Sequence, residues 1–517
     1  MTTAAENVPQ KAVGIEAVAM TKRFGEFVAL DAVSLKAGAG TFQALLGENG
    51  AGKSTLVKCI MGYYQPDQGG VIVGDREREI ANPRAAHALG LGMVYQHFTL
   101  VPAMTVTENL VLARDELPAV IDWRQETRAL ESFLEHMPFR VPLTAKVSAI
   151  SAGERQKCEI LKQLYLGRRF LILDEPTSVL TPGEADEVLG MLRAMVTRGE
   201  LSVLMITHKF REVMAFADEV TILRRGKPAG GGRVGALSAD AMARTMIGAE
   251  ELTVQPPRSG SFGAPRLAIT GLNACDDGGQ PAVRELSLTV HAGEIVGIAG
   301  VSGNGQRELV EVLAGQRDRE SGDIQIGGAP YAATRVEMRR HKLSCLPEEP
   351  LKNACVARMS VADNLAFRTF DLPPFALGGW WLKHSRMRER ADHEIGRYKI
   401  KTRSADTAVG ELSGGNVQRT VLARELGGDV DIMIAANPCF GLDFAAVAQI
   451  HAEIMAVRNR NAAVLLVSED LDELLELADR IVVIFRGRLV YDVRASEADV
   501  TEIGRHMAGA ASQPAAA

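Results

Sequence analysis

The chain has 517 residues, of which 46% are hydrophobic and 24% charged, and its formal net charge is −6. At about 150 residues per domain this length allows two to four domains, and the composition is that of a soluble globular protein. The acidic balance argues against a nucleic-acid-binding protein, which normally carries a basic excess. The amino-terminal stretch lacks the apolar core of a signal peptide, and no apolar run reaches the ~18 residues that span a bilayer. We therefore expect any membrane role to be peripheral.

A glycine-rich segment, GENGAGKST (47–55), follows the apolar run TFQALLG (41–47). The run predicts a strand, and the segment fits the phosphate-binding loop G-x-x-x-x-G-K-[ST]. A chance glycine-rich turn is the alternative, which the strand before the loop and the helix expected from near Gly52 disfavour. The backbone amides of such a loop and the positive end of its helix converge on phosphate oxygens. The predicted nucleotide contacts are Gly47, Glu48, Asn49, Gly50, Ala51, Gly52, Lys53, Ser54 and Thr55.

Two side chains of this loop and two carboxylates further along carry the predicted chemistry. Lys53 is expected to neutralise the β- and γ-phosphates, and Ser54 to ligate Mg²⁺. FLILDEP (170–176) predicts a buried strand with both carboxylates at its end. Asp174 is expected to hold Mg²⁺ through water, and Glu175 to orient and polarise the attacking water. Taken alone, such a pair is equally compatible with capping a helix.

The chain contains an internal duplication. Residues 31–62 match residues 284–315, and three further pairs follow in the same order: 150–164 with 412–426, 170–180 with 432–442, and 203–227 with 464–488. Each half alternates β-rich apolar runs with helical patterns, which favours a parallel sheet flanked by helices in an α/β fold. The carboxyl edge of such a sheet is where ligands are expected.

The duplication sets the predicted domain boundaries. We expect domains over residues 14–249 and 266–508, with a linker over 250–265 whose Pro, Gly and Ser residues favour a flexible, non-helical connection. The spacing between matched segments implies a small insertion in the second half, which we place at PPFALGGWWLKH (373–384). The last stretch, GAASQPAAA (509–517), is predicted to be a disordered tail.

Six cysteines are scattered along the chain without close pairs. This spacing favours reduced thiols in a cytosolic protein over disulfides or a metal site. They are Cys59, Cys158, Cys275, Cys345, Cys355 and Cys439.

The motif set resembles that of the ATP-binding-cassette (ABC) family, whose defining signature, LSGGQ in most members, corresponds to ISAGER (150–155) and LSGGN (412–416). The resemblance covers nearly all of both halves. It implies two tandem P-loop nucleotide-binding domains, each with a mixed sheet core and a helical subdomain. It also implies that Gln96 senses Mg²⁺ and nucleotide, that His208 contacts the γ-phosphate, and that Phe24 stacks on adenine. Taken alone, such a histidine or phenylalanine is more often structural.

The second half has lost the residues of hydrolysis. At the positions of Lys53, Ser54, Asp174, Glu175 and His208 stand, in order, Gln306, Arg307, Ala436, Asn437 and Glu469. Neutral Asn437 cannot act as a base and Ala436 cannot bind metal, so hydrolysis is predicted to be lost there. If nucleotide still binds, Arg307 is a candidate for the missing positive charge.

The signatures show the opposite bias. In the family, each ATP lies between one phosphate loop and the signature of the opposite cassette. The resemblance therefore implies that LSGGN serves the intact loop, with nucleotide contacts from Ser413, Gly414, Gly415 and Asn416. ISAGER, with Ala152 and Glu154, would serve the degenerate loop. One competent composite ATP site is the expected result.

This asymmetry is similar to that of importers for simple sugars and nucleosides, and YQHFTLVP (95–102) and GNGQ (303–306) are closer to the nucleoside type. The cofactors implied are ATP and Mg²⁺, with the metal held by Ser54, Gln96 and Asp174. The implied partners are two transmembrane permease subunits and an extracytoplasmic substrate-binding protein or lipoprotein, with no nucleic acid. The implied location is the cytoplasmic face of the inner membrane.

Two other function classes fit the sequence less well. A soluble tandem-cassette ATPase acting on ribosomes shares the duplication, but its linker is long, charged and helical, and both its sites are usually intact. A DNA-repair ATPase would carry a long coiled coil, and no sustained heptads occur here. The identity of the cargo is not readable from these residues, because the transported molecule never touches this chain.

Overall fold

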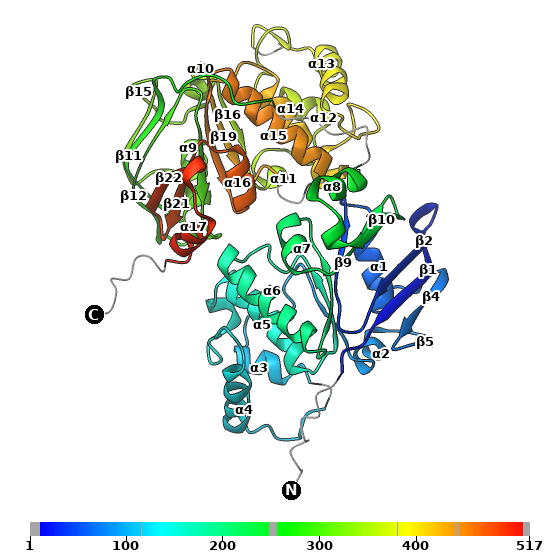
Figure 1. Ribbon diagram of the computed structural model, residues 1–517. Coiled ribbons are helices and arrows are strands. Elements are labelled where there is room, and N and C mark those ends of the chain that lie inside the picture. Colours follow the sequence, from blue (N-terminus) through cyan, green and yellow to red (C-terminus); the bar gives the residue numbers. More distant parts are fainter. Residues whose placement is uncertain are drawn as a thin grey trace, which may run out of the picture. The chain divides into compact units, whose positions relative to one another are not determined.

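The computed structural model describes residues 11–114, 116–247, 256–379, 381–439, 442 and 444–509. The chain divides into two compact units, residues 1–252 and 253–517, each described by itself below (Figure 1). Of the predicted linker, residues 250–255 lie outside the described residues, as do residues 510–517 of the predicted tail and Trp380 of the predicted insertion.

The first unit holds a six-stranded sheet in the order β10-β9-β3-β8-β7-β6 and a four-stranded antiparallel sheet in the order β2-β1-β4-β5. Strands β6 to β9 and β3 are parallel, and β10 is antiparallel at the edge. The sheet is therefore mixed, as the family resemblance implied, and the residue pattern alone missed the antiparallel sheet. The strands are β1 (Ile15–Phe24), β2 (Phe27–Ala37), β3 (Phe42–Gly47), β4 (Gln68–Val73), β5 (Arg76–Arg78), β6 (Leu91–Val94), β7 (Phe170–Asp174), β8 (Ser202–Ile206), β9 (Glu219–Arg224) and β10 (Lys227–Arg233).

Side-chain alternation places the core of the first unit on both faces of the six-stranded sheet. In β7, Phe170 and Ile172 pack with α1 and the antiparallel sheet, whereas Leu171 and Leu173 pack with α5 and α6 on the other face. Such a strand, covered on both faces, reads as a continuous apolar run. The helices are α1 (Lys53–Ile60), α2 (Pro83–Ala88), α3 (Val106–Val111), α4 (Trp123–Glu135), α5 (Ala152–Tyr165), α6 (Pro182–Thr197), α7 (Phe210–Phe216) and α8 (Ala239–Ile247).

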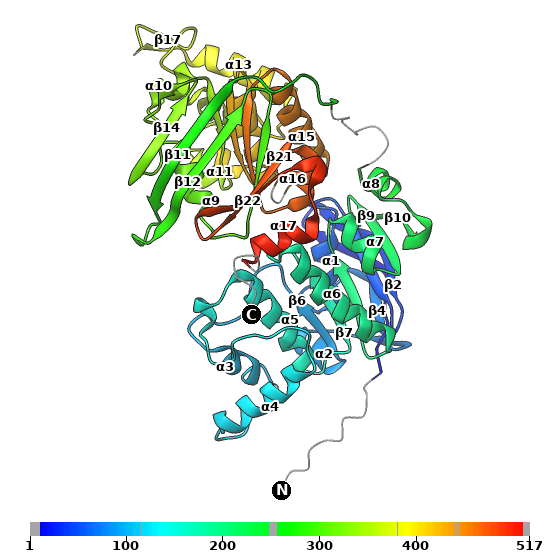
Figure 2. The same ribbon diagram turned by 60° about the vertical axis from the view of Figure 1, so that its left-hand side comes forward.

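The second unit repeats this topology. Its six-stranded sheet runs β16-β19-β20-β13-β21-β22, and its antiparallel sheet runs β12-β11-β14-β15, with the long strands β11, β12 and β14 side by side in Figure 2. The duplication predicted from the sequence is thus present in the fold. The strands are β11 (Pro265–Cys275), β12 (Pro281–His291), β13 (Ile295–Ala299), β14 (Ser321–Ile326), β15 (Ala329–Pro330), β16 (Leu343–Leu346), β19 (Ile432–Ala436), β20 (Ala463–Ser468), β21 (Arg480–Phe485) and β22 (Arg488–Arg494).

A small hairpin marks the insertion in the second unit. Strands β17 (Ala376–Leu377) and β18 (Trp381–Leu382) pair between α12 and α13, inside the predicted stretch 373–384. The corresponding connection of the first unit, residues 112–122, is shorter than residues 367–383 here. The helices of this unit are α9 (Gln306–Leu313), α10 (Arg335–Arg340), α11 (Pro350–Asn353), α12 (Val361–Ala366), α13 (His384–Arg397), α14 (Gly414–Leu426), α15 (Phe444–Asn459), α16 (Leu471–Leu477) and α17 (Val500–Met507).

The described part of the predicted linker is non-helical, as expected, but it is bonded to the second unit. Arg258 donates to the carbonyl oxygens of Glu476 and Ala478, and the Ser259 carbonyl oxygen accepts from Arg458 at 2.6 Å. These contacts restrain a segment for which the composition predicted flexibility. Among the described residues, no helix is both long and apolar enough to cross a membrane.

Candidate nucleotide-binding sites

The phosphate loop of the first unit connects β3 to α1, as predicted. Gly47 has φ 155°, and a Cβ there would lie 2.5 Å from the Leu223 carbonyl oxygen. Gly52 caps α1 with φ 101°, and a Cβ would lie 2.8 Å from the Ala29 carbonyl oxygen. Both positions therefore require glycine, because L side chains rarely adopt such φ values and here would also meet backbone. This tight packing fixes the conformation of the loop backbone and therefore the directions of its N–H groups.

Lys53 is the first residue of α1. Its Nζ donates to the carbonyl oxygens of Gly47 at 2.5 Å and of Glu48 at 3.0 Å. Burial lowers the pKa of Lys53, against the opposing charges of Glu175 and Asp174. The ammonium group therefore lies over the loop, held by carbonyl oxygens, where it can bind an anion that enters. The Ser54 side chain, at the second position of the helix, is exposed.

Three predicted residues meet at the carboxyl ends of neighbouring parallel strands. Glu175 directly follows β7 and has φ 49°, with its amide donating to the Ile206 carbonyl oxygen at 2.9 Å. Its carboxylate accepts from Gln96 Nε2, which follows β6, at 3.2 Å. Its other oxygen lies 3.2 Å from His208 Nδ1, which follows β8. The strand order β8-β7-β6 thus brings together side chains that are far apart in the sequence.

The pKa values of the two carboxyl groups at this edge are shifted in opposite directions. Burial, followed by the nearby charge of Glu175, raises the pKa of Asp174 to about 6. Burial also disfavours ionised Glu175, but the hydrogen bond and charge of His208, together with the charges of Lys53 and Lys209, outweigh it and lower the Glu175 pKa. Glu175 is therefore the ionised group suited to polarise water. A divalent cation would relieve the cost of ionising Asp174 beside it, so this donor set fits Mg²⁺.

Phe24 lies apart from this network, at the end of β1. Its side chain is 44% exposed, and in the described part of the chain its ring contacts are with Tyr64, edge to face at 5.3 Å, and with Lys22 Nζ at 5.6 Å. A ring that is 44% exposed leaves apolar surface for stacking on a base. Tyr64, which positions the ring, was not predicted, because nothing in its local sequence signals this contact.

In the phosphate loop of the second unit, the side chain at the lysine position is hydrogen-bonded to the loop backbone. Gln306 Nε2 donates to the Val301 carbonyl oxygen at 3.0 Å, and its Oε1 accepts from the Asn304 amide at 3.0 Å. Arg307 donates to Glu311 at 2.7 Å and pairs with Asp277 at 3.5 Å. The suggestion that Arg307 replaces the missing positive charge is therefore disfavoured, because two carboxylates already engage its guanidinium group.

The pocket beside this loop holds two carboxylates and one guanidinium group. Its lining includes Glu348, Glu469 and Arg307, together with Ser302 and Asn437. Burial raises the pKa of Glu469, and the nearby Glu348 carboxylate raises it further, against a hydrogen bond from Ser302. Glu348 follows β16 where Gln96 follows β6, a role the sequence did not reveal because PEEP (347–350) stood out only as a departure from the family pattern.

Asn437 keeps the backbone of Glu175 without its charge. It has φ 42°, its amide donates to the Val467 carbonyl oxygen at 2.7 Å, and its Oδ1 accepts from the Glu469 amide at 2.9 Å. Glu175 has the same left-handed backbone and the equivalent bond to Ile206. The second unit thus preserves the backbone of the site. Its pocket adds two carboxylates, and its one guanidinium group, that of Arg307, is already paired with Glu311 and Asp277.

The two signature helices begin differently. Ser151 and Glu154 form a capping box at the start of α5, in which the Glu154 carboxylate accepts from the Ser151 amide at 2.8 Å. At the start of α14, Asn416 replaces that carboxylate and donates from Nδ2 to Ser413 Oγ at 2.8 Å. Ser413 and Gly414 are exposed. The positive end of α14 is therefore open to an anion, whereas that of α5 holds an internal carboxylate.

Comparisons with known proteins agree with these motifs. The family model described as "ABC transporter" matches residues 30–178 and 283–439. The chain is 36% identical over 497 residues to the nucleoside import ATP-binding protein NupA of Lactococcus lactis subsp. cremoris (strain MG1363), covering 96% of this chain and 98% of NupA. It is 38% identical over 503 residues to the guanosine import ATP-binding protein NupO of Bacillus subtilis (strain 168), covering 97% of this chain and 98% of NupO.

Among solved structures, the RNase-L Inhibitor matches 92% of this chain and 90% of its own with a TM-score of 0.63 and 20% identity, which shows the fold alone. The family match covers both halves, and the sequence relatives match along nearly their full length. The chain therefore belongs to the ABC transporter family, as an ATPase with two tandem cassettes.

Proposed function

We propose that this chain drives an ABC importer by hydrolysing ATP at one site, built on the phosphate loop of the first unit. The observation that carries the proposal is the contrast between Glu175, ionised between Gln96 and His208, and Asn437, which keeps the same backbone without a base. The cassettes are taken as residues 14–249 and 266–508. A ribosome-acting ATPase is disfavoured, because the likeness to such proteins is one of fold alone.

The residues of the first unit have distinct roles in this proposal. Gly47, Glu48, Asn49, Gly50, Ala51, Gly52, Lys53, Ser54 and Thr55 bind the phosphates, and Phe24 stacks on the base. Mg²⁺, held by Ser54, Gln96 and Asp174, supplies charge neutralisation for the transferring phosphoryl group. Glu175 orients the attacking water and accepts its proton, and His208 keeps Glu175 ionised and contacts the γ-phosphate.

The signature of the second unit completes the proposed site. The motivation is the family arrangement, in which each ATP meets the signature of the opposite cassette, together with the carboxylate-free start of α14. Ser413, Gly414, Gly415 and Asn416 are the contacts proposed. The second unit would then remain essential to hydrolysis although its own pocket has Asn437 in place of the proposed base.

The names of the relatives support a proposal for the partners and the cargo. Because NupA and NupO are named as import ATP-binding proteins for nucleosides and guanosine, we propose nucleosides as the cargo, with simple sugars as the alternative. Two permease subunits, an extracytoplasmic binding protein or lipoprotein, and a peripheral position on the cytoplasmic face of the inner membrane complete the proposal.

An exchange of signature residues tests the one-site proposal. Asn416→Glu would place at α14 the capping carboxylate that α5 already has, which supports the helix but opposes the γ-phosphate. A charge about 4 Å from a phosphate costs on the order of 4 kcal/mol at an effective dielectric constant of 20. After allowance for screening, we expect ATPase activity to fall at least about tenfold.

The matched control is Glu154→Asn, which removes the carboxylate from α5 and should change activity less than about twofold. Equal losses in the two variants, with unchanged melting temperatures, would refute the assignment of LSGGN to the active site.

A further inference from the structure

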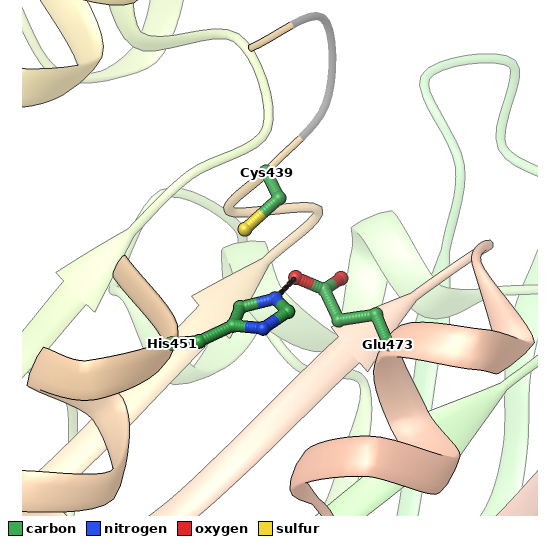
Figure 3. Close-up of side chains that lie close together, drawn as sticks. All are labelled: Cys439, His451 and Glu473. Atoms are coloured by element: carbon green, nitrogen blue, oxygen red, sulfur yellow. Dashed lines mark hydrogen bonds and ion pairs between the residues drawn. The ribbon is translucent and has the colours of Figure 1, made fainter. Parts of the chain in front are cut away.

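Three metal-ligating side chains converge in the second unit, outside the site described above. Cys439 lies just beyond β19, His451 lies on α15, and Glu473 lies on α16 (Figure 3). Their potential ligand atoms, one from each residue, all lie within 4.8 Å of one another. The side chains of His451 and Glu473 are almost fully buried.

Neighbouring groups already orient two of these side chains. His451 Nε2 lies 3.2 Å from Glu473 Oε1, and its Nδ1 lies 3.4 Å from Glu476 Oε2. Ser468 Oγ donates to the other oxygen of Glu473 at 2.6 Å. This arrangement matches the way proteins prepare a histidine ligand, in which one ring nitrogen faces the metal and the other donates to a carboxylate.

The first unit provides an internal comparison. Glu212 occupies the place of Glu473, five residues along from Thr207 as Glu473 is from Ser468, and it accepts from Thr207 in the same way. It also accepts from Thr177 Oγ1 at 2.5 Å, and Thr177 follows Glu175 where Cys439 follows Asn437.

The position of His451 in α15 is that of Leu189 in α6, which is fully buried in the apolar core. Around a carboxylate that both units share, the second unit therefore has a thiol and an imidazole where the first has a hydroxyl and an apolar side chain. Both replacements are residue types that bind transition metals.

A buried ion pair explains part of this cluster. Burial opposes protonation of His451, but Glu473 and Glu476 outweigh it and raise the His451 pKa to about 9. The ion pair does not require a thiol. Burial raises the pKa of Cys439 well above its ordinary value, as do the charge of Glu473 and its hydrogen bond with the thiol. Cys439 in place of threonine is the feature that distinguishes a metal site from an ion pair.

We propose that Cys439, His451 and Glu473 bind one Zn²⁺ ion per chain, a site independent of the nucleotide chemistry. A thiolate, an imidazole and a carboxylate are the donors that Zn²⁺ takes, with water in the fourth position. Bonds of about 2.0–2.3 Å place donor atoms roughly 3.3–3.8 Å apart in a tetrahedron. His451 Nε2 and Glu473 Oε1, 3.2 Å apart, already have about this separation, and the largest separation in the cluster, at most 4.8 Å, closes by about 1 Å.

The exchange is balanced in charge. Without metal, protonated His451 and the neutral Cys439 thiol face two carboxylates, those of Glu473 and Glu476. Zn²⁺ displaces one proton from the thiol and one from the imidazole, and both protons leave to solvent. Two positive charges enter and two leave, so the buried cluster keeps its net charge when the metal binds.

Direct metal titration of the full-length chain, freed of metal by chelation, tests the proposal. Calorimetry in two buffers with different ionisation enthalpies should give one Zn²⁺ per chain and about two protons released. Co²⁺ should give a thiolate-to-metal absorption band in the near ultraviolet.

The variants Cys439→Thr and His451→Leu carry the residues of the first unit, so the fold should tolerate them. Each should weaken Zn²⁺ binding at least about 100-fold and abolish the Co²⁺ band. Cys355→Ser, a partly buried cysteine outside the cluster, should retain both. Absence of the band in the unmodified chain, its persistence in Cys439→Thr, or its equal loss in Cys355→Ser would overturn the proposal.

Discussion

Replacing Glu175 with glutamine removes the proposed base while leaving its surroundings nearly unchanged. The glutamine carbonyl oxygen can still accept from Gln96, which lies 3.2 Å from the present carboxylate, and the amide can still approach His208. The positive φ of 49° at position 175 should be retained, because glutamate and glutamine both carry a Cβ and have similar backbone preferences. The perturbation is therefore chemical rather than structural.

The expected loss follows from the role of the carboxylate. General base catalysis contributes about 10²- to 10⁴-fold. We therefore expect kcat for ATP hydrolysis to fall at least about 100-fold, which corresponds to about 2.7 kcal/mol. Affinity for ATP should hold or increase, because one negative charge near the γ-phosphate is removed.

The assay is single-turnover hydrolysis together with equilibrium binding of a fluorescent ATP analogue, on the chain assembled with its permeases. Asn437→Gln is the matched variant in the second unit, where Asn437 stands at the position of the proposed base. Its turnover should stay within about twofold of the unmodified protein. Comparable losses from the two changes, with melting temperatures preserved, would refute the one-site reasoning.

Two further outcomes are expected. The pKa of Asp174 is raised from 3.8 in the unfolded chain to about 6 in the folded protein, so ionising this carboxyl lowers the free energy of unfolding. This loss of stability is absent below about pH 4, grows between about pH 4 and 6, and reaches its full size above about pH 6. Asp174→Asn should therefore raise the melting temperature of the Mg²⁺-free protein more at about pH 7.5 than at pH 5, and a pH-independent gain would contradict the assigned burial. For the cargo, a thermal-shift screen of the cognate binding protein should show stabilisation by nucleosides, whereas stabilisation by a pentose or hexose alone would overturn the nucleoside proposal.

The phosphate loop, the strand that ends in Asp174 and Glu175, and the duplication were all predictable from the sequence. Each is a local pattern, because its residues lie close together along the chain. Gly47 and Gly52 belong to one loop, and the apolar run directly precedes the two carboxylates. The loss of the base at Asn437 was equally visible by aligning the two halves.

Pairings across strands and helices depended on the tertiary structure. Glu348 and Glu469 meet in the second pocket because they follow different strands of one sheet. The hydrogen bonds of the Glu154 carboxylate and the Asn416 amide at the starts of α5 and α14 became visible only in the structure. Cys439, His451 and Glu473 showed no metal-binding spacing, so the sequence favoured simple reduced thiols. Local pattern fixes which backbone forms, whereas the packing of distant elements decides which side chains meet and with what charge.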